Sequence, residues 1–206
     1  MELQLSTTLF FFLFLSTKLL FMASTTAGHL FPPISDDTDY IRTSCNSTRY
    51  PKTCFKSLSG YSGLVQHDSG RLARIAIHVA LCNATHMSNY VSDMSRGRTD
   101  SGNSSESAAL KDCSSVFGDA VDQIQKSLDE MRQLGWTGES VRFQLSNVQT
   151  WMSAALTNEE TCTDGFGEVA ADSRVKADVC DRVVAVKEVT SNALALVNRY
   201  ADTITA

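Results

Sequence analysis

Proline is scarce in this chain of 206 residues, where only Pro32, Pro33 and Pro51 occur. Because a proline inside a helix costs about 3 kcal/mol, the proline-free sequence after Pro51 permits long helices. Uninterrupted apolar runs are also short, and none approaches the roughly 20 residues of an ordinary membrane span. Basic residues are outnumbered, 18 against 23 acidic ones, and the net charge of −5 argues against a nucleic-acid partner.

The composition also lacks the features of a disordered or collagen-like chain. Hydrophobic residues make up 43% of the sequence and charged residues 20%, which supplies enough apolar side chains for a core. The length suits one domain. The sequence therefore predicts a single globular domain that is mildly acidic and is attracted to basic partners.

Residues 1–27 are expected to form a secretory signal peptide. A short apolar run, interrupted by Lys18, is followed by small residues up to Ala27. The alternative is a signal anchor, but Lys18 breaks the apolar span that an anchor would need. We therefore expect cleavage after Ala27 and secretion, with residues 28–37 as a linker and residues 38–204 as the folded domain.

Secretion changes the interpretation of the six cysteines. In an oxidising compartment an even number of cysteines indicates disulfides rather than catalytic thiols. Three Asn-x-Ser/Thr sequons, at Asn46, Asn83 and Asn103, are consistent with the same compartment. Asn103 lies in a polar stretch of Gly and Ser and is the favoured glycan site, whereas Asn83 falls within a predicted helix.

Four long segments between glycine clusters have apolar residues three to five positions apart, the spacing of an amphipathic helix. The expected helices cover about residues 70–95, 105–134, 141–166 and 173–202. The fourth is rich in valine, which favours a strand, but a strand of that length would be exceptional. Four such helices with short connections predict an all-α, up-down-up-down four-helix bundle. Residues 38–58 predict two short helical turns that form a hairpin before it.

Individual positions of these helices can be assigned from the same spacing. Cys82 of the first helix and Trp151 of the third belong to apolar stripes, and the charged Glu159 interrupts the stripe of the third. Asp68 or Ser69 is the expected N-terminal cap of the first helix.

The predicted bundle limits how the cysteines can pair. Cys45 and Cys54 are close in sequence and would staple the hairpin, which has few apolar groups of its own. Cys113 and Cys162 lie within about 12 Å of the same end of an antiparallel helix pair, which permits a bridge.

Cys82 and Cys180 are less well placed to form a disulfide with each other. Their depths in the bundle differ by roughly 9 Å, which is more than the usual Cα separation of a disulfide. An additional bridge and two buried free thiols are both open alternatives.

Catalytic patterns are missing from the sequence. There is no Gly-x-Ser-x-Gly elbow, phosphate-binding loop, dinucleotide fingerprint or His-Glu-x-x-His. His78, Cys82 and His86 share one helical face and could hold zinc, but a fourth ligand is not evident. We therefore expect a protein that is not an enzyme and that uses no cofactor or metal.

The run Trp151–Asn158, continued by Thr161-Cys162 and Asp164-Gly165-Phe166, resembles the plant pectin methylesterase inhibitor and invertase inhibitor family. The resemblance extends over about residues 40–201. Weaker matches are the Cys45 and Cys54 pair with Tyr50-Pro51, residues 110–113 with 120–122, and residues 191–196.

This resemblance implies a secreted protein of the apoplast or cell wall, built as a four-helix bundle with an N-terminal helical hairpin. It also implies two disulfides, Cys45–Cys54 and Cys113–Cys162. Cys82 is an addition to the four-cysteine pattern of the family.

The family has two functional branches, which inhibit pectin methylesterases and acid invertases. Invertase inhibitors typically have a Pro-Lys-Phe-like motif before the last helix, and residues 167–179 contain no proline. The Ser-Ala-Ala-Leu-Thr-Asn sequence also favours the esterase branch. The same bundle occurs as a pro-region of some pectin methylesterases, and a chain that ends at Ala206 without a catalytic domain resembles the free-standing form.

The resemblance further implies reversible 1:1 occlusion of the esterase active-site cleft by a face of the bundle. Candidate interface positions on the second and third helices are Lys111, Asp119, Gln123, Lys126 and Gln149. Inhibition of an acid invertase is the first alternative. An alternative of another class is a secreted carrier that holds a small ligand between its helices, for which an internal cavity would be the discriminating observation.

Overall fold

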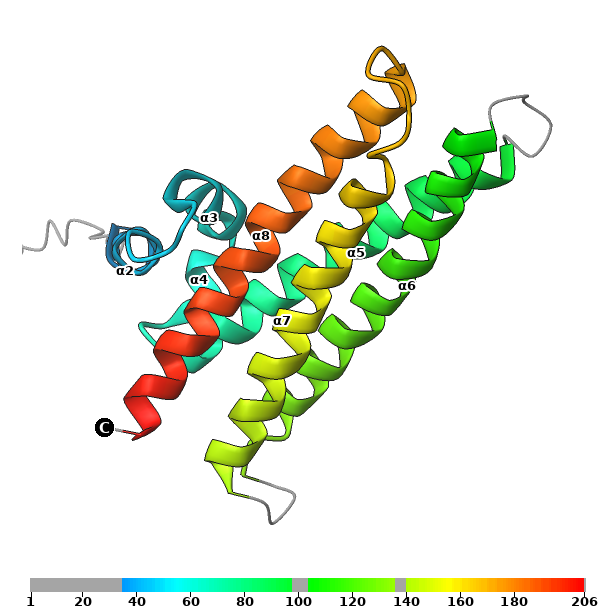
Figure 1. Ribbon diagram of the computed structural model, residues 1–206. Coiled ribbons are helices and arrows are strands. Elements are labelled where there is room, and N and C mark those ends of the chain that lie inside the picture. The colour runs from blue at the N-terminus through cyan, green and yellow to red at the C-terminus, as the bar shows by residue number, and fades with distance from the viewer. Residues whose placement is uncertain (1–34, 98–103, 136–139, 206) are drawn as a thin grey trace, which may run out of the picture. The chain divides into compact units, whose positions relative to one another are not determined.

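The computed structural model describes residues 35–97, 104–135 and 140–205 (Figure 1). The expected signal peptide over 1–27, most of the expected linker and the sequon at Asn103 lie outside these residues. Regular structure within the described residues is entirely helical, as predicted. None of the described helices combines the length and the hydropathy that crossing a membrane would require.

Four long helices follow one another along the chain: α5 (Ser69–Gly97), α6 (Ser104–Arg132), α7 (Val141–Gly165) and α8 (Arg174–Thr205). Each packs against the next, and α8 closes the ring by packing against α5. Consecutive helices run in alternating directions (Figure 1). The predicted up-down-up-down bundle is confirmed, with helix ends within a few residues of those expected.

Valines of α8 show why a helix forms from β-branched residues. Helix propensity disfavours valine by at most about 0.7 kcal/mol, whereas burying its side chain contributes roughly 1.5 to 3 kcal/mol. Packing therefore decides the conformation. The buried valines of α8 are Val175, Val179, Val183, Val186, Val189 and Val197.

Two positions assigned to the core are wrong. Cys82 is exposed and Trp151 is only half-buried. The inward face of α5 includes small residues such as Ala80 and Ala84, and the buried neighbour of Trp151 is Met152. A stripe traced through the larger apolar residues therefore selects Cys82 and Trp151, although the neighbouring alanines and Met152 are the residues that face the core.

Side-chain caps fix the starts of three long helices. In each case a side-chain oxygen accepts a hydrogen bond from the backbone N–H three residues later in the chain. The accepting residues are Asp68 (2.6 Å), Ser140 (3.3 Å) and Ser173 (3.1 Å). Of the two candidate caps for α5, Asp68 is the one that accepts this hydrogen bond. These bonds satisfy amides that have no partner inside the helix.

A helical hairpin precedes the bundle, formed by α2 (Ser35–Cys45) and α3 (Pro51–Leu58). The helix α2 begins three residues before the expected start at Thr38. Two further short elements, η1 (Ser59–Tyr61) and α4 (Ser62–Val65), connect the hairpin to α5 and were not predicted. They are single turns, too short to show a periodic pattern in the sequence.

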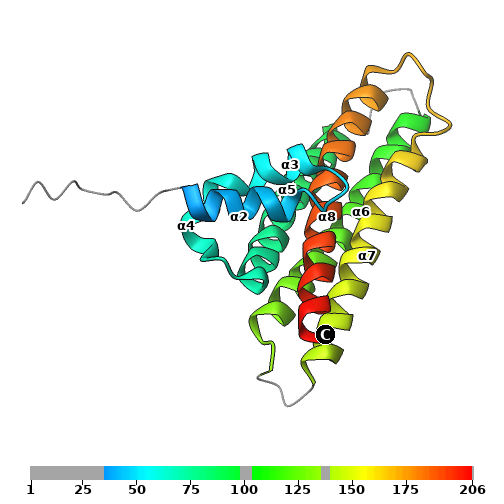
Figure 2. The same cartoon turned by 90° about the vertical axis from the view of Figure 1, so that its left-hand side faces the viewer.

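The hairpin packs on the α8 side of the bundle, away from α6 and α7 (Figure 2). Asn192 of α8 holds it there through both backbone groups of Tyr50, accepting from the amide at 3.1 Å and donating to the carbonyl at 3.0 Å. The Thr53 hydroxyl also donates to Glu188 of α8. Because Asn192 is 2% exposed, these bonds replace those that water would otherwise form.

Two disulfides occur among the described residues, Cys45–Cys54 within the hairpin and Cys113–Cys162 between α6 and α7. They are the pairs that the family resemblance implies. The first spans 9 residues of sequence and the second spans 49.

The difference in loop length generates a prediction. The chain-entropy model gives about 4 kcal/mol for the bridge spanning 49 residues and about 2.5 kcal/mol for the one spanning 9. We expect the double variant Cys113→Ser, Cys162→Ser to lower the unfolding midpoint more than Cys45→Ser, Cys54→Ser. The second variant should loosen the hairpin and leave the bundle folded. Thermal unfolding followed by circular dichroism tests this, and equal losses of midpoint would contradict it.

Candidate functional site

Polar side chains join α6 and α7 along the outside of the bundle. The Asn158 side-chain amide donates to Gln123 Oε1 at 3.1 Å, and the Asn147 amide donates to Glu130 Oε1 at 3.4 Å. Trp151, which is half-buried, lies between Asn147 and Asn158 on the same side of α7 by helical spacing. These hydrogen bonds hold the two helices as one continuous surface.

The outer face of α7 carries no charge from Phe143 to Asn158. Its exposed hydroxyls donate to carbonyls of their own helix, with Thr150 bound to Ser146 at 2.8 Å and Ser153 bound to Gln149 at 2.8 Å. Thr157 and Thr161 repeat the arrangement. A surface whose donors are already satisfied and which bears no charge has a low cost of desolvation when a partner covers it.

The adjoining surface of α6 is acidic. Asp119 and Asp122 are exposed and Glu130 is half-buried, against the single base Lys126 on the same stretch. We call this combined surface the α6–α7 face; it comprises Asp119, Asp122, Lys126 and Glu130 of α6 with Asn147, Thr150, Trp151, Thr157 and Asn158 of α7.

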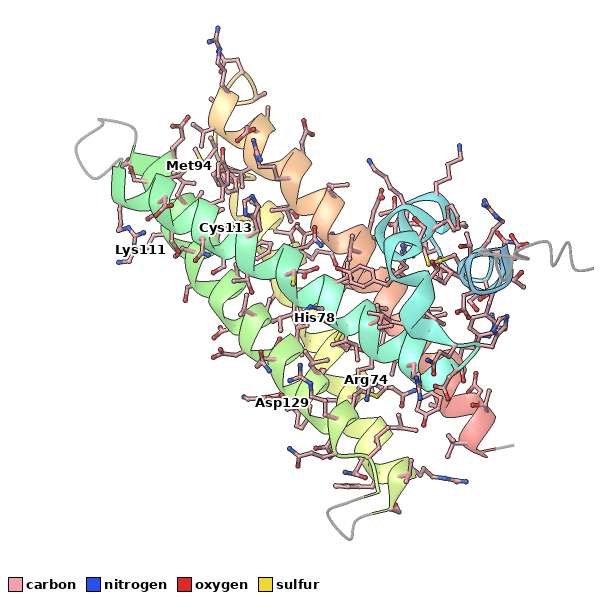
Figure 3. All side chains as sticks on the ribbon, turned by 180° about the vertical axis from the view of Figure 1, so that it is seen from behind. Arg74, His78, Met94, Lys111, Cys113 and Asp129 are labelled. Atoms are coloured by element: carbon pink, nitrogen blue, oxygen red, sulfur yellow. A yellow bond between two sulfur atoms is a disulfide. The ribbon has the colours of Figure 1, made fainter. Side chains whose placement is uncertain are left out.

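The predicted interface residues are distributed over more than this face. Lys111, Asp119 and Lys126 are exposed on α6, and Figure 3 shows Lys111 near the end of α6 where that helix begins. Gln123 was expected to be exposed but is half-buried between α6 and α7, where it accepts the hydrogen bond from Asn158. Gln149 is also half-buried, and it donates to Asn198 of α8 at 3.0 Å, so it lies on the opposite side of α7.

Sequence reasoning missed Asn147 and Asn158 as the polar link of this face. Asn158 belongs to the run Trp151–Asn158 that carries the family resemblance. Its four-residue spacing from Ala154 places Asn158 and Ala154 on one side of α7, which is the signal that could have assigned Asn158 to this face.

The histidines and cysteine of α5 do not form a metal centre. Cys82 Sγ lies 3.8 Å from His78 Nε2, yet the described residues contain no group of three His, Cys, Asp or Glu side chains that could hold an ion. Cys82 and Cys180 are free thiols, exposed and half-buried respectively, and partial burial raises the pKa of Cys180 above its usual value. The six cysteines, all of which lie in the described ranges, therefore form no third bridge.

The two described sequons differ in geometry. Asn46 is exposed in the turn between α2 and α3. Asn83 is half-buried in the middle of α5, and its side-chain amide donates to the Val79 carbonyl at 2.8 Å. A glycan on Asn83 would displace that hydrogen bond.

Glu159 is the one ionisable residue in the described core. Its side chain is 0% exposed, Oε1 accepts from the Thr190 hydroxyl at 2.7 Å, and Oε2 has no hydrogen-bond partner. Burial raises its pKa from 4.5 to about 8, opposed by the Thr190 hydrogen bond and by Lys187, which pairs with Glu160. Glu159, which interrupts the apolar stripe of α7, is therefore neutral below a pH of about 8.

The described residues define an all-α class of protein, a disulfide-linked four-helix bundle preceded by a helical hairpin. The model of the plant invertase/pectin methylesterase inhibitor family matches residues 39–196, and the chain belongs to this family. The family is named for inhibitors of invertases and pectin methylesterases.

Similar proteins agree with this assignment. The chain is 38% identical over 202 residues to pectinesterase inhibitor 9 of Arabidopsis thaliana, covering 97% of this chain and 96% of that protein. It is 40% identical over 200 residues to pectinesterase inhibitor 11 of the same species, covering 96% and 97%. A crystal structure of a mutant form of a pectin methylesterase inhibitor from Arabidopsis matches with a TM-score of 0.61, over 77% of this chain and 95% of that one. Because that sequence identity is 17%, the structural likeness concerns the fold alone.

The buried Glu159 predicts a loss of stability with rising pH. Its pKa is higher in the folded chain than in the unfolded one, so its contribution is full below about 4.5 and is lost as pH rises to about 8. We expect the unfolding midpoint of the wild type to fall by roughly 5 to 10 °C over this range, from a loss of a few kcal/mol.

Thermal unfolding from pH 4 to 9 tests the assignment. Glu159→Gln should fall less steeply than the wild type, whereas the exposed control Glu168→Gln should follow the wild type. Parallel curves for Glu159→Gln and the wild type would contradict the assigned role.

Proposed function

We propose that this chain is an inhibitor of plant pectin methylesterase that binds the enzyme reversibly and 1:1, covering its active-site cleft. Similarity over nearly the full length to proteins named pectinesterase inhibitors is the observation that supports this most strongly. Inhibition needs no chemistry from the inhibitor, which agrees with the missing catalytic motifs.

The α6–α7 face is the surface proposed to contact the enzyme. The helix α7 has 25 residues and is about 37 Å long, and two adjacent helices are roughly 20 Å wide. Their outer surface therefore approaches the 800 Å² per partner that stable protein complexes bury. Partial burial of Trp151 also suits an interface, where aromatic residues often dominate the binding energy.

Charge supports a basic partner surface. The acidic side chains of α6 and the net charge of −5 would accelerate encounter with a basic enzyme, and salt would reduce that acceleration. The uncharged α7 surface would supply the contact that is least sensitive to salt.

The alternatives have less support. The invertase interpretation lacks the proline-containing motif before α8. The carrier interpretation requires space along the bundle axis, where Phe117, Ile124, Leu145 and Met152 are at most 1% exposed and fill the core.

Secretion and glycosylation are part of the proposal. A signal peptide over residues 1–27 would deliver the chain to the cell wall and expose its sequons to glycosylation. We expect Asn46 to carry a glycan and Asn83 to carry none, in addition to the expected glycan at Asn103. Intact mass spectrometry of protein secreted from plant cells tests this: Asn46→Gln should remove one glycan mass, and Asn83→Gln should leave the glycan mass unchanged. The reverse result would contradict the structural argument.

Inhibition itself is tested by titrating a panel of pectin methylesterases and acid invertases with the mature protein. We expect saturable loss of ester hydrolysis at one inhibitor per enzyme, recovery when the two chains are separated, and invertase that remains active. Inhibition of invertase alone would overturn the branch assignment, and inhibition of neither would overturn the function.

The position of the face is tested with two matched variants. Thr150→Arg places a long charged side chain at an exposed position in the middle of the uncharged α7 surface, on the same side of the helix as Asn147 by its three-residue spacing, and Ala185→Arg does so at an exposed position in the middle of α8. We expect Thr150→Arg to weaken inhibition at least tenfold, a loss of about 1.4 kcal/mol, and Ala185→Arg to leave it unchanged. Circular dichroism confirms that both variants are folded, and equal potency would place the interface elsewhere.

A further inference from the structure

We propose that a groove between α5 and α6 binds a de-esterified uronate polysaccharide, the anionic product that a pectin methylesterase releases. The inference rests on the proposed function for the identity of the polymer and on the groove itself for the site. It would give the protein a second binding surface, on the other side of α6 from the α6–α7 face.

Two neighbouring depressions make up the groove, with volumes of about 290 and 310 Å³. Arg74 of α5 and Arg132 of α6 line both depressions, which therefore adjoin at these two side chains. We call the two depressions together the channel. Figure 3 shows Arg74 and His78 on α5 beside Asp129 of α6. Each depression is of a size that suits a small organic group such as a sugar unit rather than a single ion.

Basic side chains are concentrated on this channel. Arg71, Arg74 and His78 follow one another at three- and four-residue spacing on α5, which places them on one side of the helix. Arg74 has no side-chain hydrogen bond or ion pair with any described residue, so its guanidinium is available to a ligand. Arg132 is bound to Asp129 at 3.1 Å through one nitrogen, which leaves its remaining donors.

Acidic groups are also present and limit the net charge. Asp68 lines the channel but is engaged as the cap of α5, and Asp129 is engaged with Arg132. The channel is therefore basic by a small margin on a protein with a net charge of −5. A polyanion would be repelled by the chain as a whole, so any binding must come from local contacts rather than from overall charge.

Apolar and aromatic groups form the rest of the channel wall. Tyr61 lines one depression and Tyr200 the other, and Leu64 is 61% exposed at the edge. The Tyr200 ring is positioned by Gly70, where a Cβ atom would lie 2.9 Å from the ring. A wall of this kind with a few charged groups is typical of sites that bind a ligand with apolar and polar faces.

The chemistry of the ligand follows from these groups. A planar guanidinium binds a carboxylate through two parallel hydrogen bonds, and sugar rings offer apolar C–H faces to aromatic side chains. A polymer of uronic acids presents both features repeatedly along its length. Its methyl ester has the same rings without the charge, so the channel would distinguish the product of the esterase from its substrate.

The test measures binding of oligosaccharides directly, without the enzyme. Isothermal titration calorimetry of the full mature protein uses a galacturonate oligosaccharide, its methyl-esterified form, and polyglutamate of equal charge. We expect binding of the galacturonate oligomer alone. The double variant Arg74→Gln, Arg132→Gln should weaken it at least fivefold, whereas Arg142→Gln, Arg174→Gln, which removes two exposed arginines elsewhere, should not.

Each other outcome overturns the proposal. The proposal is overturned if the wild type does not bind the galacturonate oligomer, or if it binds polyglutamate equally well. It is also overturned if the two double variants weaken binding equally. Inhibition assays on the same proteins separate this inference from the proposed function, because the Arg74→Gln, Arg132→Gln variant should inhibit the esterase as the wild type does. Loss of inhibition in that variant would assign the channel to the enzyme interface instead.

Discussion

The register of α6 against α7 is the constraint on which the proposed inhibitory surface depends. The Cys113–Cys162 disulfide fixes it covalently near one end of the pair. Gln144 fixes it at the other end, where its side chain is fully buried, donates to the Gln133 carbonyl at 3.1 Å and accepts from the Gly135 amide at 2.7 Å. Gly135 has φ of 77°, a conformation that glycine adopts without strain. The Asn158–Gln123 and Asn147–Glu130 hydrogen bonds lie between these two fixed points.

The register matters because the α6–α7 face is assembled from two helices. A shift of one residue on either helix would rotate its outward positions by about 100° and separate Gln123 from Asn158. The acidic stretch of α6 and the uncharged stretch of α7 would then no longer adjoin. The helix α8 performs a different task, since Asn192 positions the hairpin on it and Thr190 binds the buried Glu159. The hairpin is consequently held away from the face rather than over it.

Sequence patterns predicted the helices and their order well, because amphipathic spacing and the absence of proline act locally. The buried polar groups could not be found in that way. Gln144, Glu159 and Asn192 occupy core positions that a count of apolar residues scores as interruptions. The partner of Gln144 lies in the turn after α6, and the partners of Glu159 and Asn192 are distant in sequence. The hydrogen bonds between α6 and α7 were not predicted for a related reason. Helical spacing places a residue on one side of its helix, but it does not identify which neighbouring helix that side contacts. Gln149 was therefore grouped with residues of α6 although it bonds to α8.

The buried Glu159 shows why one polar residue can be retained in such a core. An unpaired carboxylate in a low-dielectric interior is costly, whereas the protonated acid needs only the hydrogen bond that Thr190 supplies. The core is accordingly compatible with acidic surroundings and is weakened in alkaline ones. If the protein acts in an acidic cell wall, as proposed, the α7–α8 contact has its full stability where inhibition takes place. A loss of inhibition at higher pH would then have two separable sources, repulsion between charges at the enzyme interface and loosening of the α7 helix that supports the face.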